Sequence, residues 1–137
     1  MRARFGILRG MAEGSRKRFV GLIIEAGETS LSTRKLIVET AGYNCLSAIS
    51  GAQGLEFAGR HPIDFVIYDI DVHDLPIPET IGKLRQKFPK APVYLLTPQG
   101  WEPEALRGVS DGVFEKMRDP MEMIRTIEQR LLESEAA

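Results

Sequence analysis

A run of four apolar and aromatic residues, Phe65 to Tyr68, that ends at Asp69 constrains the fold of this chain more than any other feature. A continuous apolar run of this length predicts a strand covered on both faces, as in parallel sheets. In open α/β sheets, ligands and chemistry gather beyond the carboxyl ends of such strands, where Asp69 would lie. Aspartate is also common in the turn that ends a strand, so this run alone leaves both interpretations open.

Four further short apolar runs predict strands, and helical patterns separate them. Together the predicted strands cover residues 19–24, 44–48, 65–69, 93–97 and 112–115. Helices are predicted over 30–40, 50–58, 78–88 and from 120 onward, and the segment 99–109 offers only one short helix, around 102–106. This alternation predicts an α/β fold of (βα)5 type, a doubly wound parallel five-stranded sheet between two layers of helices.

The predicted helices have inner faces and ends that can be read from the sequence. In the first, a Thr29 or Ser30 cap precedes the helix and Gly42 ends it. Its inner face is predicted to hold Leu31, Leu36, Ile37 and Thr40. In the second, Leu55 and Ala58 are expected to face inward, and the last helix should bury Met123, Ile124, Ile127, Leu131 and Leu132.

Composition is ordinary for one globular domain of 137 residues, with 43% hydrophobic and 27% charged residues. The chain has no apolar run near the ~20 residues that cross a bilayer and no signal peptide, so we expect a cytoplasmic protein without membrane contact. Its single cysteine, Cys45, has no partner for an intrachain disulfide or a cysteine zinc site, and is expected to be a small core residue.

Charge is concentrated in the first 18 residues, where six basic residues face one acid, a net of +5 that leaves −6 for the rest of the chain. We therefore divide the chain into a basic N-terminal arm (1–18), a domain (19–133) and a short C-terminal tail (134–137). A basic arm can bind nucleic acid, but a solvated leader explains it as well, and the acidic domain argues against nucleic acid as the main partner. Whether the arm pairs two copies of the chain stays open.

Four polar side chains stand at the ends of predicted strands. Glu25 follows the first, Asp69 ends the third, Thr97 ends the fourth and Lys116 follows the fifth. Parallel strands would bring all four to one edge of the sheet. A carboxylate with a second acid nearby suits a divalent cation, a hydroxyl can hold a phosphoryl oxygen, and an ammonium can neutralise an anionic product. These are the parts of a phosphoryl-transfer site.

With these residues in this order, the chain resembles the receiver domain of bacterial two-component response regulators over about residues 19–133. The likeness includes Ala41-Gly42-Tyr43, Ala48-Ile49-Ser50-Gly51, Pro92 and Asp119-Pro120. It implies a flavodoxin-like sheet with strand order 2-1-3-4-5, and Asp69 as the phosphoryl acceptor. It also implies that Thr97 and Lys116 contact the phosphoryl group and that Glu25, Asp69 and the carbonyl of Asp71 hold Mg²⁺.

Four positions depart from the pattern of that family. Ala26 replaces the second acid of the pair that ligates magnesium, so weak Mg²⁺ binding is expected even if Asp71 or Asp74 contributes. Pro98 stands after the threonine, Val113 occupies the position of a switch aromatic, and Met117 replaces a proline. Two nearby residues stay ambiguous: His73 is expected to be an exposed turn residue, and Trp101 either fills a gap or receives a partner.

Three functions are consistent with these residues. The first is a stand-alone receiver, not an enzyme, which accepts a phosphoryl group on Asp69 from a histidine kinase or phosphotransfer protein and signals to a downstream protein. The second is a pseudo-receiver that binds its partner whatever the state of Asp69. The third is a haloacid-dehalogenase-like phosphatase, suggested by Asp69-x-Asp71, although only Asp119 is available for the further acidic pair that this family needs.

Overall fold

The computed structural model describes residues 19–136, so the predicted basic arm (1–18) and Ala137 lie outside it. Five parallel strands form one sheet in the order β2-β1-β3-β4-β5, as expected. The strands are β1 (Val20–Ile24), β2 (Asn44–Ala48), β3 (Phe65–Asp69), β4 (Val93–Thr97) and β5 (Gly112–Glu115). The predicted bounds agree with these to within one residue, most clearly for the fully buried β3 and β4, which are apolar runs that end in one polar residue.

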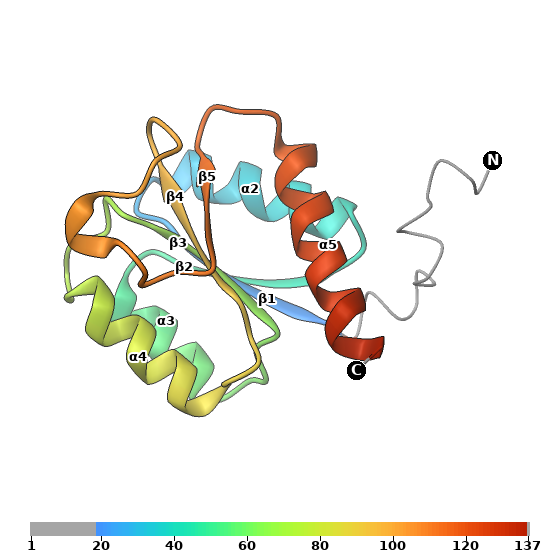
Figure 1. Cartoon of the computed structure of the whole chain (residues 1–137), viewed down its shortest axis with the longest axis horizontal. Helices are drawn as coiled ribbons and strands as arrows, with labels where there is room; N and C mark the ends of the chain where they lie inside the picture. The colour runs from blue at the N-terminus through green and yellow to red at the C-terminus, as the bar shows by residue number, and fades with distance from the viewer. Residues whose placement is uncertain (1–18, 137) are drawn as a thin grey trace.

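Two helices cover each face of the sheet (Figure 1). On one face lie α2 (Glu28–Thr40) and α5 (Pro120–Ala136), and on the other lie α3 (Gly51–Ala58) and α4 (Ile77–Lys87). Successive strand residues point to opposite faces, so each strand supplies both cores. In β1, Ile23 packs in the core of α2 and α5, whereas Leu22 and Ile24 pack in the core of α3 and α4.

The inner face of α2 differs from the predicted one. Leu31 and Val38 are buried, but Leu36 is 64% exposed and Thr40 is also exposed. The helix begins at Glu28 behind Gly27, with no side-chain cap, so the predicted Thr29 or Ser30 cap is wrong. The buried stripe includes a charged residue, Arg34, which an apolar pattern does not reveal.

The start of α3 and the ends of α2 and α5 can be explained locally. Gly42 has a φ of 105°, the left-handed conformation expected after a helix. The Ser50 side chain accepts a hydrogen bond from the backbone N–H of Gln53 at 3.0 Å, and Gln53 Oε1 accepts one from the N–H of Ile49 at 2.8 Å. This reciprocal arrangement resembles a capping box. Residues 134–136, expected in a tail, continue α5, whose final Glu and Ala residues favour helix.

The connection from β4 to β5 contains only a 3-10 turn, η3 (Glu104–Leu106), so the (βα)5 pattern has four α-helices within residues 19–136. Pro98 and Pro103 interrupt this segment, and Gly100 and Gly108 both have a φ of 77°, which no helix tolerates. Leu106 fills the space on the sheet and is buried. Trp101 is 60% exposed, so of the two roles considered for it, filling this gap is excluded.

The predicted interior of the last helix is confirmed. Met123, Ile124, Ile127 and Leu131 are buried against the sheet, and Leu132 packs beside them. None of the helices described in residues 19–136 is long and apolar enough to cross a membrane.

Candidate functional site

The parallel register brings the four predicted strand-end residues to one edge of the sheet. Ile24 pairs with Tyr68, so Glu25 and Asp69 stand at neighbouring positions beyond that pair. Asp69 pairs with Leu96, which puts Thr97 one residue further along β4. The backbone N–H of Lys116 donates to the carbonyl of Thr97 at 3.0 Å. The sheet therefore aligns residues that are up to 91 positions apart in the chain.

Asp69 and Lys116 form the centre of this edge. The Asp69 carboxylate is buried, and its Oδ2 lies 2.8 Å from Nζ of Lys116. The other oxygen, Oδ1, accepts the backbone N–H of Asp71 at 2.9 Å, which fixes the carboxylate at the turn after β3. The same Lys116 ammonium lies 3.1 Å from Oδ2 of the exposed Asp71 side chain. One cation therefore bridges two carboxylates.

The two carboxylates hold Lys116 in its charged form. Burial by itself lowers the pKa of Lys116, but hydrogen bonds and charge attraction from Asp69 and Asp71 outweigh it and raise this pKa above its ordinary value of 10.5. The lysine side chain is still 22% exposed. It is thus a permanent positive charge beside Asp69 with room to move toward water.

Thr97 supplies a hydroxyl that has no hydrogen-bond partner among the described residues. The residue is 1% exposed, and its Oγ1 is buried without an acceptor or donor. Leaving a buried hydroxyl unpaired costs about 1–3 kcal/mol. Such an atom at the same strand edge as Asp69 is suited to a hydrogen bond with an incoming anionic group.

Glu25 does not stand free at this edge. Its carboxylate, on a residue only 1% exposed, is held by Arg34 of α2 at two points, with Nε 2.8 Å from Oε1 and Nη2 3.3 Å from Oε2. The Arg34 side chain is itself 11% exposed. The sequence analysis missed Arg34. Its position on the inner stripe of α2, three residues after Leu31 and four before Val38, was the available signal.

Two other acids near the site are used to cap helices. Asp74 accepts the N–H groups of Gly51 and Ala52 at 2.8 and 3.0 Å, at the start of α3. These bonds, chiefly that from Ala52, lower the pKa of Asp74. Asp119 Oδ1 accepts the N–H of Met121 at 2.9 Å, at the start of α5. Asp74 is therefore not a ready substitute for the acid that Ala26 replaces, and Asp119 has a structural role.

The carboxylates predicted to hold magnesium are paired with cations in this arrangement. Within residues 19–136, no group of three or more carboxylate, histidine or cysteine side chains is placed to hold a metal ion. Glu25 is paired with Arg34, and Asp69 and Asp71 share Lys116. Ala26 is exposed and offers only a methyl group. The side chains present do not fit a preformed divalent-cation site.

The remaining departures lie around the rim of the site. Pro98 is exposed, and Met117 is 90% exposed in the loop after β5. Val113 is partly buried against the core of α3 and α4. His73 is exposed, as expected for a turn residue. A shallow hollow of about 520 Å³ borders the site between the β3–α4 connection and η3.

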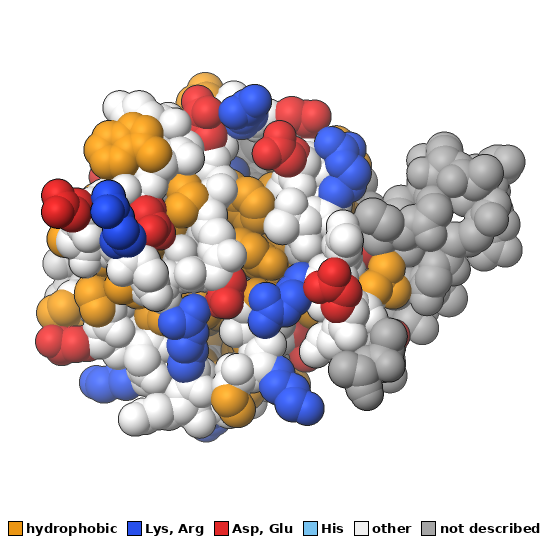
Figure 2. Space-filling model, in the orientation of Figure 1, with side chains coloured by type: hydrophobic (Ala, Val, Ile, Leu, Met, Phe, Trp, Pro, Cys, Tyr) orange, Lys and Arg blue, Asp and Glu red, His pale blue; other side chains and the backbone are white. Residues whose placement is uncertain are grey.

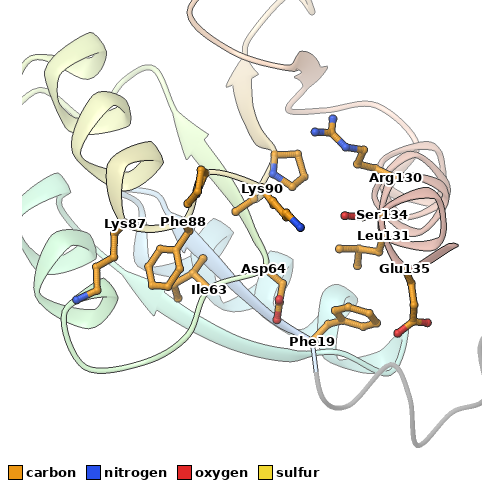
Figure 3. Close-up of a pocket in the computed structure, with 13 residues that line it drawn as sticks. Phe19, Ile63, Asp64, Lys87, Phe88, Lys90, Arg130, Leu131, Ser134 and Glu135 are labelled. Atoms are coloured by element: carbon orange, nitrogen blue, oxygen red, sulfur yellow. The ribbon is translucent and has the colours of Figure 1, made fainter. Parts of the chain in front are cut away.

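A separate hollow of about 400 Å³ lies at the opposite edge of the sheet (Figure 3). It is lined by residues that precede strands, among them Phe19, Asp64 and Pro92, and by the last turns of α4 and α5. It is thus a strand length away from Asp69. On the face seen in Figure 2, basic and acidic side chains are interspersed, with apolar side chains exposed among them.

No family model matches the chain. Among curated proteins, it is 28% identical to the transcriptional regulatory protein GlrR of Escherichia coli over 101 residues, 74% of this chain and 23% of that protein. It is 30% identical to the probable transcriptional regulator ycf29 of Porphyra purpurea over 91 residues, 63% of this chain and 44% of that protein. The chain spans less than half the length of these relatives.

Solved structures are more similar in shape than in sequence. A CheY-like response regulator receiver domain from Methanospirillum hungatei superposes with a TM-score of 0.76 at 22% identity, covering 86% of this chain and 97% of that one. The chain has the fold of response-regulator receiver domains. The response regulator TrrA of Thermotoga maritima, solved with Mg²⁺ and BeF, has the receiver fold at a TM-score of 0.70, with 20% identity over 82% of this chain and 98% of that one. The resemblance drawn from the sequence is confirmed.

Proposed function

We propose that this receiver-fold domain accepts a phosphoryl group on Asp69. The observation that carries the proposal is the ion pair of Asp69 with Lys116, at the same edge of the sheet as the buried and unpartnered hydroxyl of Thr97. An acyl phosphate would add negative charge and acceptor oxygens at this point. The Lys116 ammonium would neutralise that charge, and the Thr97 hydroxyl would donate the hydrogen bond that it lacks in the unmodified protein.

The proposed transfer is an attack of an Asp69 carboxylate oxygen on the phosphorus of the donor. The new O–P bond forms as the bond from phosphorus to the donor nitrogen or oxygen breaks, and the donor leaves with that electron pair. Positioning and charge neutralisation supply most of the catalysis in such reactions. Lys116 must move from Oδ2 of Asp69 to the incoming phosphoryl oxygens, which its partial exposure permits.

Magnesium enters this proposal only as a weak ligand. Related receiver domains have been solved with the ion, including that of the sensor histidine kinase PA1611 of Pseudomonas aeruginosa, with magnesium coordinated in its active-site cleft. Here the carboxylates predicted to bind it are paired with Arg34 and Lys116. We therefore assign the charge neutralisation at Asp69 to Lys116.

As a signalling module, the domain would receive its phosphoryl group from a histidine kinase or a phosphotransfer protein in the cytoplasm. It would then act on a downstream protein through its surface, as a stand-alone receiver and not as an enzyme for small substrates. The curated relatives are transcriptional regulators of which the chain spans a part. This supports a place in two-component signalling.

The test uses acetyl phosphate as the donor. We expect the wild-type chain to gain the mass of one phosphoryl group, mapped to Asp69 after trapping with hydroxylamine or borohydride. The Asp69→Asn variant should gain none. Asp71→Asn is the matched control, because it removes a carboxylate that shares Lys116 but leaves the proposed acceptor in place. Labelling of Asp69→Asn, or no labelling of the wild type, would exclude the proposal.

A second candidate is a pseudo-receiver that binds a partner independently of phosphorylation. The pairing of Glu25 with Arg34, together with Ala26, favours it, because both remove metal ligands from the site. Amide chemical shifts of the wild type and Asp69→Asn, each with acetyl phosphate, separate the two candidates. A phosphorylated switch should show shifts along β4 and β5 in the wild type only. Identical spectra would favour the pseudo-receiver.

A further inference from the structure

We infer that Arg34 takes the place of a metal ion beside Glu25, so that Glu25 is not a metal ligand in this chain and release of Glu25 from Arg34 creates a stronger divalent-cation site. The inference rests on the proposed function only in treating the same strand edge as the functional site. It concerns the unphosphorylated protein, and it can be tested without phosphoryl transfer.

The charge balance of the site is the first argument. Three carboxylates, those of Glu25, Asp69 and Asp71, face two cations, Arg34 and Lys116, so a net charge of −1 is left. Oxygen sites for divalent cations gain affinity from the number of charged ligands they offer. In this chain the two resident cations already satisfy most of that charge. A divalent ion must therefore displace at least one of them to bind.

The two cations differ in how readily they can be displaced. Lys116 is 22% exposed and holds Asp69 through a single ammonium, so it can turn toward water. Arg34 is 11% exposed and binds Glu25 at two points, and a guanidinium does not lose its proton. Separating this pair would leave a mostly buried guanidinium without its acceptor, which is costly. A metal ion therefore competes at Asp69 and Asp71, and not at Glu25.

The position of Arg34 in the fold makes the pairing permanent. It lies on the buried stripe of α2 between Leu31 and Val38, both of which are in the core of α2 and α5. Glu25 follows β1 directly, and its N–H donates to the carbonyl of Ala48 at 3.0 Å, so its backbone is held by the sheet. Both members of the pair thus sit on rigid elements. No loop movement within the described chain is needed to form the pair or to maintain it.

The first test asks whether Glu25 is a ligand. Mg²⁺ alone is titrated into the full, unphosphorylated chain, and binding is followed by the amide shifts of the β3–α4 connection. We expect Glu25→Gln, which keeps the shape of the side chain, to bind Mg²⁺ as the wild type does. Asp69→Asn should weaken binding. A loss of Mg²⁺ affinity in Glu25→Gln comparable to that in Asp69→Asn would overturn the inference.

The second test removes the resident cation. We expect Arg34→Met to bind Mg²⁺ about tenfold more tightly than the wild type, because a released carboxylate can join the site as a ligand. The matched control is the double variant Glu25→Gln/Arg34→Met, which loses the cation but gains no free carboxylate and should bind like the wild type. Equal tightening in the single and double variants would show that Arg34 acts only through its charge, and would overturn the assignment.

Folding of the variants is controlled separately. Arg34→Met leaves a buried carboxylate unpaired, whereas the double variant buries a neutral pair, so circular dichroism and urea unfolding are recorded for each. If Arg34→Met does not fold, the Glu25→Gln titration still decides the inference. Failure of Asp69 to accept a phosphoryl group would exclude the proposed function but would not alter any of these Mg²⁺ affinities.

Discussion

The Lys116 ammonium lies 2.8 Å from a carboxylate oxygen of Asp69, in a pair whose acid is buried and whose base is partly exposed. The asymmetry means that the two partners do not contribute equally to stability. Removing the lysine leaves a buried charge, whereas removing the acid frees a lysine that can reach water. Stability and function therefore both depend on the lysine, for different reasons.

We predict that Lys116→Met lowers the free energy of unfolding by about 3 kcal/mol at pH 7, the lower end of the cost of breaking a buried pair. The folded-state pKa of Lys116 is raised above 10.5, so the folded protein holds this proton more tightly than the unfolded chain. The stabilisation of the fold by Lys116 is therefore complete below pH 10.5 and is lost as the pH rises through the folded-state pKa. Urea unfolding of both proteins from pH 7 upward checks this. A difference that stays constant at alkaline pH would contradict it.

We predict that a methyl group at Gly54 of α3 destabilises the fold. A Cβ there would lie 2.6 Å from Cδ1 of Ile24, a core residue of β1 that is 0% exposed and cannot easily shift. Gly54→Ala should therefore destabilise the protein by about 1–3 kcal/mol, as overpacking does. Gly82→Ala in α4 is the control, because nothing lies within 4 Å of its Cβ position. That change should stabilise by about 0.8–1.0 kcal/mol through helix propensity, and equal effects at both sites would refute the packing argument.

The strands could be predicted because their signal is local. Buried strands such as β3 and β4 need uninterrupted apolar residues, and the polar residue that ends each of them, Asp69 or Thr97, marks the edge where the site lies. The absence of a regular helix between β4 and β5 was also foreseeable, because Pro103 and Gly108 forbid it. These features depend on neighbours in the sequence.

The features that could not be predicted depend on contacts between distant elements. Gly54 weakens a helix by propensity, yet it is required because Ile24 packs against its backbone. Arg34 was missed because nothing in the local sequence shows that its acceptor, Glu25, would lie beneath it. The apolar pattern therefore placed Leu36 on the inner face of α2, where it is in fact 64% exposed, and gave no sign of the mostly buried Arg34.

Asp74 is predicted to stabilise the start of α3 in a pH-dependent way. Its carboxylate accepts two backbone N–H groups of the first turn, and these bonds lower its pKa from 3.8. The ionised form is thus favoured by folding, so the stabilisation is present above pH 3.8 and is lost as the pH falls through the lower folded-state pKa. Asp74→Ala should cost about 1 kcal/mol at pH 7, as the loss of a helix cap does. Thermal unfolding at pH 7 and at low pH checks this, and a cost that persists in acid would contradict it.

Cys45 of β2 is predicted to be unreactive in the folded protein. It is buried, and desolvation, followed by the nearby charge of Glu39, raises its pKa to about 12 from 9.0. Between pH 9 and pH 12 the folded protein therefore keeps the thiol proton that the unfolded chain loses. Below pH 9 this thiol does not reduce the free energy of unfolding. As the pH rises from 9 toward 12, that free energy falls by about 4 kcal/mol in all. We expect an aromatic disulfide reagent at pH 8 to label Cys45 only in urea, and Cys45→Ala to reduce the alkaline loss of stability. Rapid labelling of the native chain would contradict the burial of this thiol.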